Sequence, residues 1–210
     1  MESKEDLKKL YKKIKPEIKK RIKEFKDNLN KNIEDIFAEL SFCILTPQSK
    51  AEICWQAIET LKKENLLFYG HESEISEKLK KVRFNKKKAK YIILARKKFF
   101  ESNLKDLIKT CKDIHLLREI LVKNIKGFGM KEASHFLRNI GLGDNIAILD
   151  RHILKNLKNF RIIEKIPETL TKKKYIEIEK KFINFSKKIK IKPDELDLLL
   201  WAKETGKVFK

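Results

Sequence analysis

The chain has 210 residues, enough for one large domain or for two small domains around a shared cleft. Lys and Arg number 51 against 30 Asp and Glu, so the formal net charge is +21. This excess favours a polyanionic partner, with nucleic acid ahead of an anionic membrane, although a Lys-rich hyperthermophile proteome is an alternative source of part of the charge.

Cysteine usage and hydropathy exclude several classes of protein. The three cysteines, at positions 43, 54 and 111, are too few and wrongly spaced for a disulfide framework or a zinc site. The N-terminal stretch lacks the apolar core of a signal peptide, and no apolar run approaches the roughly 18 residues that a membrane span needs. We therefore expect a cytoplasmic protein without a membrane partner.

Apolar residues recur with helical spacing along nearly the whole chain, which predicts an all-α protein of about ten helices. Pro16 interrupts the first apolar stripe and favours a kink there. Thr46 followed by Pro47 is typical of an N-cap and a first helical residue, so a helix is expected from there to Leu61. The run 145–149 is the one short apolar segment that fits an extended conformation. The other helices are expected at 7–25, 33–44, 73–81, 86–100, 103–109, 113–125, 130–140, 150–159, 168–187 and 194–203.

Basic residues are concentrated in two runs, 78–98 and 151–192, and the first of these contains no acidic residue. A charge run is most often only a solvated helix face. The two runs gain interest because a candidate DNA-binding element, residues 113–140, lies between them.

The sequence "IKGFG", residues 125–129, separates two predicted helices and is typical of a helix-hairpin-helix motif at 113–140. Glycines at 127 and 129 allow positive φ and leave backbone amides uncovered, which suits phosphate oxygens beside a helix N-terminus. Contacts of this kind hold a nucleic-acid backbone without reading its sequence. The alternative is an ordinary glycine C-cap between two packed helices.

Two charged residues near the hairpin could carry chemistry. Lys131 lies on the polar side of its helix with His135 and Arg138, so its amine is either solvated or directed at whatever lies beside the hairpin. Asp150, nineteen residues later, precedes a predicted helix and begins a D-x-H triplet that ends at His152. Taken alone, Lys131 is one surface lysine among many and Asp150 is a helix cap.

Together, "IKGFGMKEA" (125–133) and "ILDRH" (148–152) resemble the helix-hairpin-helix/Gly-Pro-Asp superfamily of DNA glycosylases. The resemblance implies that Lys131 is the catalytic lysine and Asp150 the catalytic aspartate of a base-excision repair enzyme. Two departures are that Lys126 stands where the hairpin commonly has a proline, and that the loop before Asp150 has none.

The same resemblance assigns residues that contact DNA. "TPQSK" (46–50) is similar to the superfamily's S-x-Q loop, which makes Gln48 the residue that enters the duplex where the damaged base leaves. Its alternative is a first-turn residue of an ordinary helix. The remaining DNA contacts implied are Lys126, Gly127, Phe128, Gly129 and His152.

The superfamily's hairpin often holds a monovalent cation through backbone carbonyls. The resemblance places such carbonyls at Lys123, Ile125 and Phe128. The last cysteine is Cys111, so the iron–sulfur cluster found on C-terminal cysteines in one branch is not expected. No cofactor is expected to be required.

The chain is most similar to the type-2 8-oxoguanine DNA glycosylase/lyases of archaea, which implies a prokaryotic, nucleoid-associated enzyme. In that family the C-terminal residue reaches the base pocket and a tryptophan of the last helix stacks on the flipped base, which points to Lys210 and Trp201. Phe84 is a second candidate stacking face and Asp194 a candidate polar contact to the purine. The alternatives are a core anchor for Trp201 and a first-turn carboxylate for Asp194.

The sequence thus predicts two helical subdomains, 33–140 and 1–32 with 141–210, that flank a DNA-binding cleft. The predicted function is a bifunctional glycosylase/AP lyase that excises 8-oxoguanine from duplex DNA as a monomer. One alternative retains the chemistry but changes the base to an oxidised pyrimidine or another damaged purine. The other alternative is a helix-hairpin-helix DNA-binding protein without catalysis.

Overall fold

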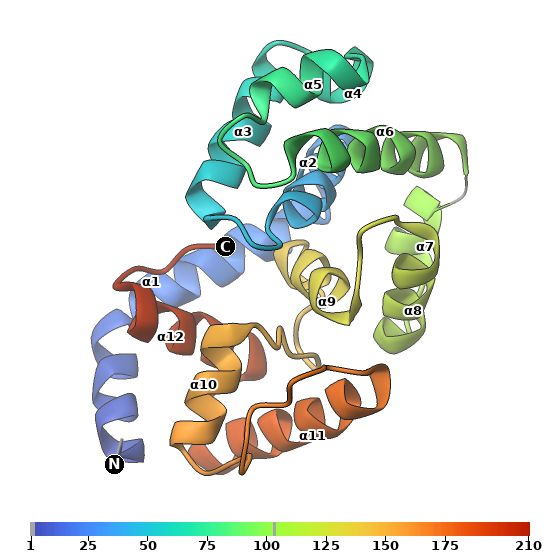
Figure 1. Cartoon of the computed structure of the whole chain (residues 1–210). Helices are drawn as coiled ribbons and strands as arrows, with labels where there is room; N and C mark the ends of the chain where they lie inside the picture. Colours follow the sequence, from blue (N-terminus) through green and yellow to red (C-terminus); the bar gives the residue numbers. More distant parts are fainter. Residues whose placement is uncertain (1–2, 103) are drawn as a thin grey trace. The chain divides into compact units, whose positions relative to one another are not determined.

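The computed structural model describes residues 3–102 and 104–210, and these form twelve α-helices and no strand (Figure 1). The all-α prediction is therefore confirmed. Each predicted helix has a counterpart, but some bounds differ: the helix predicted at 73–81 ends at Lys78, and the helix predicted at 168–187 begins at Lys172. The first residue of the helix predicted at 103–109 lies outside the described residues. The helix that the periodicity missed is α4 (Leu66–Tyr69), which at four residues is too short to repeat an apolar stripe.

The chain divides into two compact units: Met1–Asp27 with Leu137–Lys210, and Asn28–Phe136. We call them unit 1 and unit 2. The predicted subdomains have the same order along the chain, with boundaries four or five residues away at 33 and 140. The second boundary falls within one helix, α9 (Met130–Asn139).

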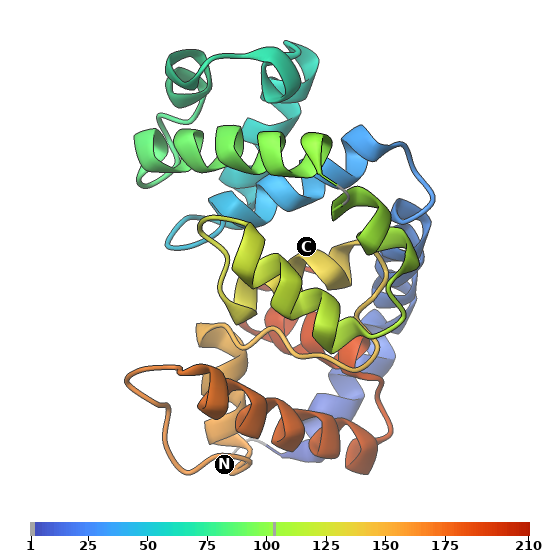
Figure 2. The same ribbon diagram turned by 90° about the vertical axis from the view of Figure 1, so that its right-hand side faces the viewer.

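Unit 2 is built on α2 (Ile33–Leu45), whose residues from Ile36 onward are all buried. The Asn32 side chain caps this helix by accepting the Asp35 N–H at 2.8 Å. The longest helix of the unit, α6 (Asn85–Glu101), packs against α2 and α5 (Glu72–Lys78) (Figures 1 and 2). The unit also contains α3 (Ala51–Lys63), α7 (Leu104–Thr110) and α8 (Ile114–Asn124).

The helix predicted to begin at Thr46 begins instead at Ala51, and residues 46–50 form a turn. Thr46 is not an N-cap, because its N–H donates to Phe42 O at 3.2 Å and its hydroxyl donates to Cys43 O at 3.1 Å. Both bonds attach it to the preceding helix. Gln48 has a φ of +56°, which takes it out of any helix.

Unit 1 contains α1 (Lys4–Asn28), α10 (Arg151–Asn159), α11 (Lys172–Ile189) and α12 (Pro193–Thr205). Both α10 and α11 pack against α12, whose residues from Asp194 to Leu200 are buried. The first helix is assigned without interruption through Pro16.

In the apolar run 145–149 the residues from Ile146 onward are buried and Asn145 is exposed, and the run is not a strand. Its backbone groups bond to side chains of α11: Ala147 N–H donates to Glu179 Oε1 at 2.8 Å, and Tyr175 Oη donates to Ala147 O at 2.6 Å. Buried backbone groups need partners, and here a helix supplies them in place of a neighbouring strand. The run therefore leads into α10 along a fixed path.

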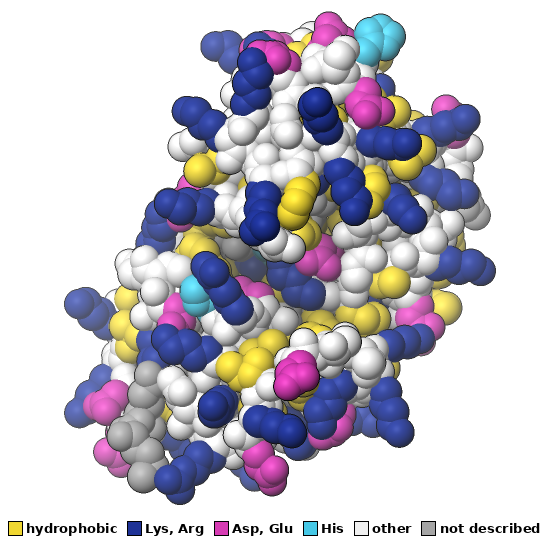
Figure 3. All heavy atoms as spheres, in the orientation of Figure 1, with side chains coloured by type: hydrophobic (Ala, Val, Ile, Leu, Met, Phe, Trp, Pro, Cys, Tyr) yellow, Lys and Arg dark blue, Asp and Glu magenta, His cyan; other side chains and the backbone are white. Residues whose placement is uncertain are grey.

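Charge and hydropathy at the surface agree with the composition. Lys and Arg side chains are spread widely over the face that Figure 3 presents. None of the helices in the described ranges is long and apolar enough to cross a membrane.

Candidate active site

The hairpin between α8 and α9 uses its two glycines differently. Gly127 has a φ of +93°, and a Cβ there would lie 2.6 Å from Cδ2 of Tyr91 on α6, so the turn requires glycine. Gly129 is not in the positive-φ region, and its N–H donates to Glu132 Oε2 at 3.1 Å. Gly129 thus does not use the positive φ that a glycine allows, and its amide, expected to be uncovered, is occupied by Glu132.

Lys131 occupies the first turn of α9, immediately beyond the hairpin. Its side chain is 21 % exposed, and its Nζ lies 3.5 Å from Thr46 Oγ1 and 3.8 Å from Glu132 Oε1. The end of α2 and the start of α9 therefore enclose the amine without sealing it. Because the amine is not fully buried, a substrate atom can reach it.

The rest of the polar side of α9 is buried rather than solvated. His135 is 5 % exposed, with its ring 5.5 Å from that of Phe42 in an edge-on arrangement. Arg138, also 5 % exposed, pairs with Asp197 at 3.4 Å within unit 1. Of Lys131, His135 and Arg138, which helical spacing places on one side of α9, only Lys131 has a partly exposed side chain.

The turn at 46–50 is tied to α6 by a buried lysine. Lys88 Nζ donates to Leu45 O at 2.7 Å, to Pro47 O at 2.7 Å and to Ser49 Oγ at 3.1 Å. Its side chain is nearly enclosed, and this burial lowers the pKa of Lys88, as do the positive charges of Lys131 and other neighbours. Gln48, between two of these anchored residues, remains exposed.

Phe84 lies in a second turn with a positive φ of +61° and is half exposed. The Arg83 guanidinium lies 4.8 Å from the centre of its ring. The Arg83 N–H donates to Ser49 Oγ at 3.1 Å, so this turn is hydrogen-bonded to the one that carries Gln48. The turns that carry Gln48, the predicted DNA contact, and Phe84, the predicted base contact, are therefore connected within unit 2.

Asp150 is the N-cap of α10 in unit 1. Its Oδ1 accepts the N–H groups of His152 and Ile153, both at 2.8 Å. Tyr175 and Glu179 anchor the segment that precedes it, as described above. Both bonds use Oδ1, which leaves Oδ2 available to a substrate. The capping role foreseen from the sequence is confirmed, and a chemical role is compatible with it.

The remaining candidates lie on α12 and at the C-terminus of unit 1. Trp201 is partly exposed and its ring lies 6.2 Å from that of Phe209, whereas Leu198 to Leu200 are buried. The leucines rather than Trp201 anchor the helix. Asp194 is 5 % exposed, and burial raises its pKa, with further contributions from the negative charges of Asp144 and Glu195.

Sequence analysis missed several residues that position these groups: Lys88, Ser49, Glu132, Tyr175 and Glu179. Lys88 did carry a signal, because it lies four residues before Ile92 and so continues the buried stripe of α6 formed with Ala95 and Phe99. The density of lysines around it concealed that signal. The others become recognisable only when distant segments are brought together.

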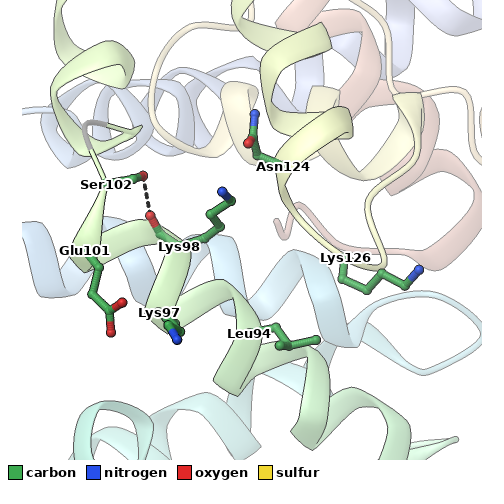
Figure 4. A pocket seen from close by; sticks show the side chains of 7 residues that line it. All are labelled: Leu94, Lys97, Lys98, Glu101, Ser102, Asn124 and Lys126. Atoms are coloured by element: carbon green, nitrogen blue, oxygen red, sulfur yellow. Dashed lines mark hydrogen bonds between the residues drawn. The ribbon is translucent and has the colours of Figure 1, made fainter.

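Unit 2 also has a hollow of about 450 Å³ between α6 and the end of α8 (Figure 4). Lysines dominate its lining, and Lys126 of the hairpin contributes to one side. Lys131 does not line it, so this hollow is separate from the candidate nucleophile. The lining residues are Leu94, Lys97, Lys98, Glu101, Ser102, Asn124 and Lys126.

The described residues form an all-helical fold with a helix-hairpin-helix motif. This motif is followed directly by Lys131, whose amine is partly enclosed. A family model described as 8-oxoguanine DNA glycosylase matches residues 18–191. The chain belongs to this family.

Named relatives agree with this assignment. An 8-oxoguanine DNA glycosylase/AP lyase of Fusobacterium nucleatum is 52% identical over 184 residues, covering 86% of this chain and 85% of the relative. The Methanocaldococcus jannaschii protein of the same description is 45% identical over 185 residues, or 86% of each chain. These relatives include a bacterial protein, so the similarity extends beyond archaea.

Solved structures are similar over nearly the whole chain. The Methanocaldococcus jannaschii 8-oxoguanine glycosylase/lyase, in complex with a 15mer DNA containing 8-oxoguanine, has a TM-score of 0.91 at 42% identity and covers 99% of both chains. The Thermotoga maritima 8-oxoguanine DNA glycosylase has a TM-score of 0.90 at 37% identity, covering 99% of this chain and 98% of that one.

Proposed function

We propose that this chain is a bifunctional DNA glycosylase/AP lyase that removes 8-oxoguanine from duplex DNA and then cleaves the backbone at the abasic site. The observation that carries the proposal is Lys131, which follows the hairpin directly and presents a partly exposed amine beside Thr46. Family membership supports both the substrate and the two-step activity.

The chemistry begins with extrusion of the damaged nucleotide, because a stacked base hides the bond between base and sugar. The neutral amine of Lys131 attacks C1′ of the deoxyribose, and the N-glycosidic bond breaks as the base leaves with a proton. The covalent adduct becomes a Schiff base between Nζ and C1′ as the C1′–O4′ bond breaks, which opens the sugar ring and leaves a protonated O4′ hydroxyl. Loss of a C2′ proton then expels the 3′ phosphate by β-elimination, and hydrolysis returns free Lys131.

Asp150 stabilises the positive charge that develops on the sugar as the base departs. Its two hydrogen bonds from the start of α10 orient the carboxylate. His152, two residues into the same helix, is proposed to contact the DNA.

The hairpin is proposed to bind the DNA backbone through main-chain groups of residues 126–129 and the Lys126 amine. Phe128 contributes only its backbone, because its ring is buried against Phe136. The hairpin carbonyls of Lys123, Ile125 and Phe128 are proposed to hold a monovalent cation. Ile125 O already accepts the Phe128 N–H at 3.1 Å, but a carbonyl has a second lone pair, so this bond is compatible with a cation.

The base itself is proposed to be held by Trp201, Phe84, Asp194 and the C-terminal carboxylate of Lys210. 8-Oxoguanine differs from guanine in having an N7–H donor, so discrimination needs an acceptor at that position. A carboxyl or carbonyl oxygen supplies one. Gln48 is proposed to fill the space that the flipped nucleotide leaves in the duplex.

Borohydride trapping tests the nucleophile directly, because it reduces the Schiff base to a stable protein–DNA adduct. Wild-type protein is expected to form the adduct with duplex DNA containing 8-oxoguanine, and Lys131→Gln to form none. Lys109→Gln, on the exposed side of α7, is the matched control and should trap like the wild type. Normal trapping by Lys131→Gln would remove this residue from the mechanism.

The same assay separates the alternatives when it is run on several lesions. Preferential adduct formation with oxidised pyrimidines would retain the chemistry and change the substrate. Tight duplex binding without any adduct would instead indicate a binding protein that has no catalytic function.

A further inference from the structure

Lys88 is a buried cation whose ammonium, among the described residues, donates hydrogen bonds only to uncharged oxygen atoms. It is 5 % exposed and has no ion-pair partner among the described residues. Its ammonium has three N–H donors, and three acceptors surround it: two carbonyl oxygens and the Ser49 hydroxyl. Burying a charge without a counter-charge opposes folding, so stability alone is a poor explanation for this residue.

The segment that Lys88 holds is backbone in a strained conformation. Gln48 has a φ of +56°, a region that side chains other than glycine rarely occupy, and it lies between the anchored residues Pro47 and Ser49. Such conformations persist when the surrounding contacts over-determine them, and they are concentrated at functional sites. The bonds from Lys88 are contacts of this kind.

Lys88 is also connected to the turn that carries Phe84, through the Ser49 hydroxyl. Ser49 Oγ accepts a hydrogen bond from Lys88 Nζ at 3.1 Å and another from the Arg83 N–H at 3.1 Å. Phe84, next in the chain, has a φ of +61°, and its carbonyl accepts the Lys88 N–H at 2.9 Å. Lys88 and Ser49 thus connect both turns at their backbones.

We propose that Lys88, acting through Ser49, is a positioning residue that holds the Gln48 and Phe84 turns in the geometry needed to flip the damaged nucleotide. The role rests on the function proposed above. Neither Lys88 nor Ser49 touches the substrate; they fix the two side chains that do. Thr46, whose hydroxyl lies beside the Lys131 amine, is hydrogen-bonded to α2 rather than to Lys88.

The positioning role leads to a specific prediction for Lys88→Met. This substitution nearly keeps the length of the side chain but removes its Nζ hydrogen-bond donors. Excision of 8-oxoguanine from duplex DNA in single turnover should fall by about tenfold or more, as expected when a reacting group is misplaced. Borohydride trapping of an abasic site in single-stranded DNA, which needs no flipping, should remain within about twofold of the wild type.

The chain offers a matched control on the same helix. Arg96, about two turns beyond Lys88, is also partly buried and donates to Gly70 O at 2.9 Å and to Leu67 O at 3.4 Å. The loop that it anchors, between α4 and α5, carries no candidate site residue. Arg96→Met should therefore leave duplex excision and single-strand trapping in the wild-type ratio, even if it lowers Tm.

A direct readout of flipping separates positioning from general stability. With 2-aminopurine placed beside the lesion, wild-type binding should raise the fluorescence as the helix unstacks, and Lys88→Met should lose most of that rise. An unchanged fluorescence rise in Lys88→Met would overturn the proposal. It would also be overturned if Lys88→Met, like Arg96→Met, kept the wild-type ratio of duplex excision to single-strand trapping.

Ser49 variants test the link even if Lys88→Met folds poorly. Ser49→Ala should reduce duplex excision and the fluorescence rise, whereas Ser49→Thr, which keeps the hydroxyl, should restore both. Wild-type behaviour of Ser49→Ala would contradict the proposal. Failure of the catalytic assignment is distinguishable, because it would appear as normal trapping by Lys131→Gln whatever the Lys88 and Ser49 variants do.

Discussion

At the scale of single residues, Asp150 has an observed structural role and a proposed chemical role. One carboxylate oxygen accepts both free amides of α10, so the side chain is oriented before any substrate arrives. The structural task needs only a hydrogen-bond acceptor, whereas the proposed chemical task needs a negative charge. A substitution that keeps the acceptor and removes the charge separates the two.

Asp150→Asn is that substitution, since Asn is as good an N-cap as Asp. We expect the single-turnover rate of base release to fall by about a hundredfold or more, with Tm and duplex affinity nearly unchanged. The control is Asp113→Asn at the equivalent cap of α8, where Asp113 accepts the His115 and Leu116 N–H groups. Equal base release by the two variants would show that the charge of Asp150 is not used.

At the scale of elements, the hairpin is set by a close approach of its turn to α6 rather than by two equivalent glycines. Gly127 has a positive φ and no room for a Cβ beside Tyr91, whereas Gly129 is an ordinary residue next to the start of α9. The exposed turn therefore depends on one position.

Gly127→Ala should destabilise the protein and weaken duplex binding, because it adds a clash with Tyr91 to the roughly 1 kcal/mol cost of a positive φ. Gly206→Ala isolates the backbone cost: its φ is +82° and nothing lies within 4 Å of the added Cβ. Thermal unfolding and a duplex-binding titration provide the comparison. Tyr91→Ala should partly rescue Gly127→Ala, and equal effects of the two glycine variants would contradict the steric explanation.

At the scale of the whole molecule, the net charge of +21 makes DNA affinity strongly dependent on salt. Basic side chains are widely spread over the visible surface, so most of them provide a diffuse attraction rather than specific contacts (Figure 3). A lysine in direct contact with a phosphate differs in that its removal releases one fewer counterion on binding.

Lys126 is the hairpin lysine proposed to make such a contact. Lys126→Gln should reduce the slope of log affinity against log salt concentration by about 0.9, the change expected for one phosphate contact. Lys180→Gln, on an exposed position of α11, changes the net charge equally and should alter the slope much less. Binding titrations at several salt concentrations measure both slopes, and indistinguishable values would count against a phosphate contact at Lys126.

Much of this protein was determined by the sequence alone, because the interactions concerned are local. Apolar spacing identified every helix longer than one turn, and Asp150 was recognised as a cap since its partners are two and three residues away. The hairpin motif, Lys131 and the spacing to Asp150 were sufficient to identify the family that the comparisons confirm.

What only the tertiary structure decided depends on contacts between distant segments. The turn at 46–50 was mistaken for a helix start, because the bonds from Lys88 that hold it come from about forty residues away. Apolar spacing indicated only that the run 145–149 fits an extended conformation, whereas its hydrogen-bond partners come from α11. Burial of His135 and Arg138 likewise reflects what packs against α9, which no helical periodicity encodes. The spacing of residues along the sequence specifies which side chains share one face of a helix. Tertiary packing decides which other segments contact that face.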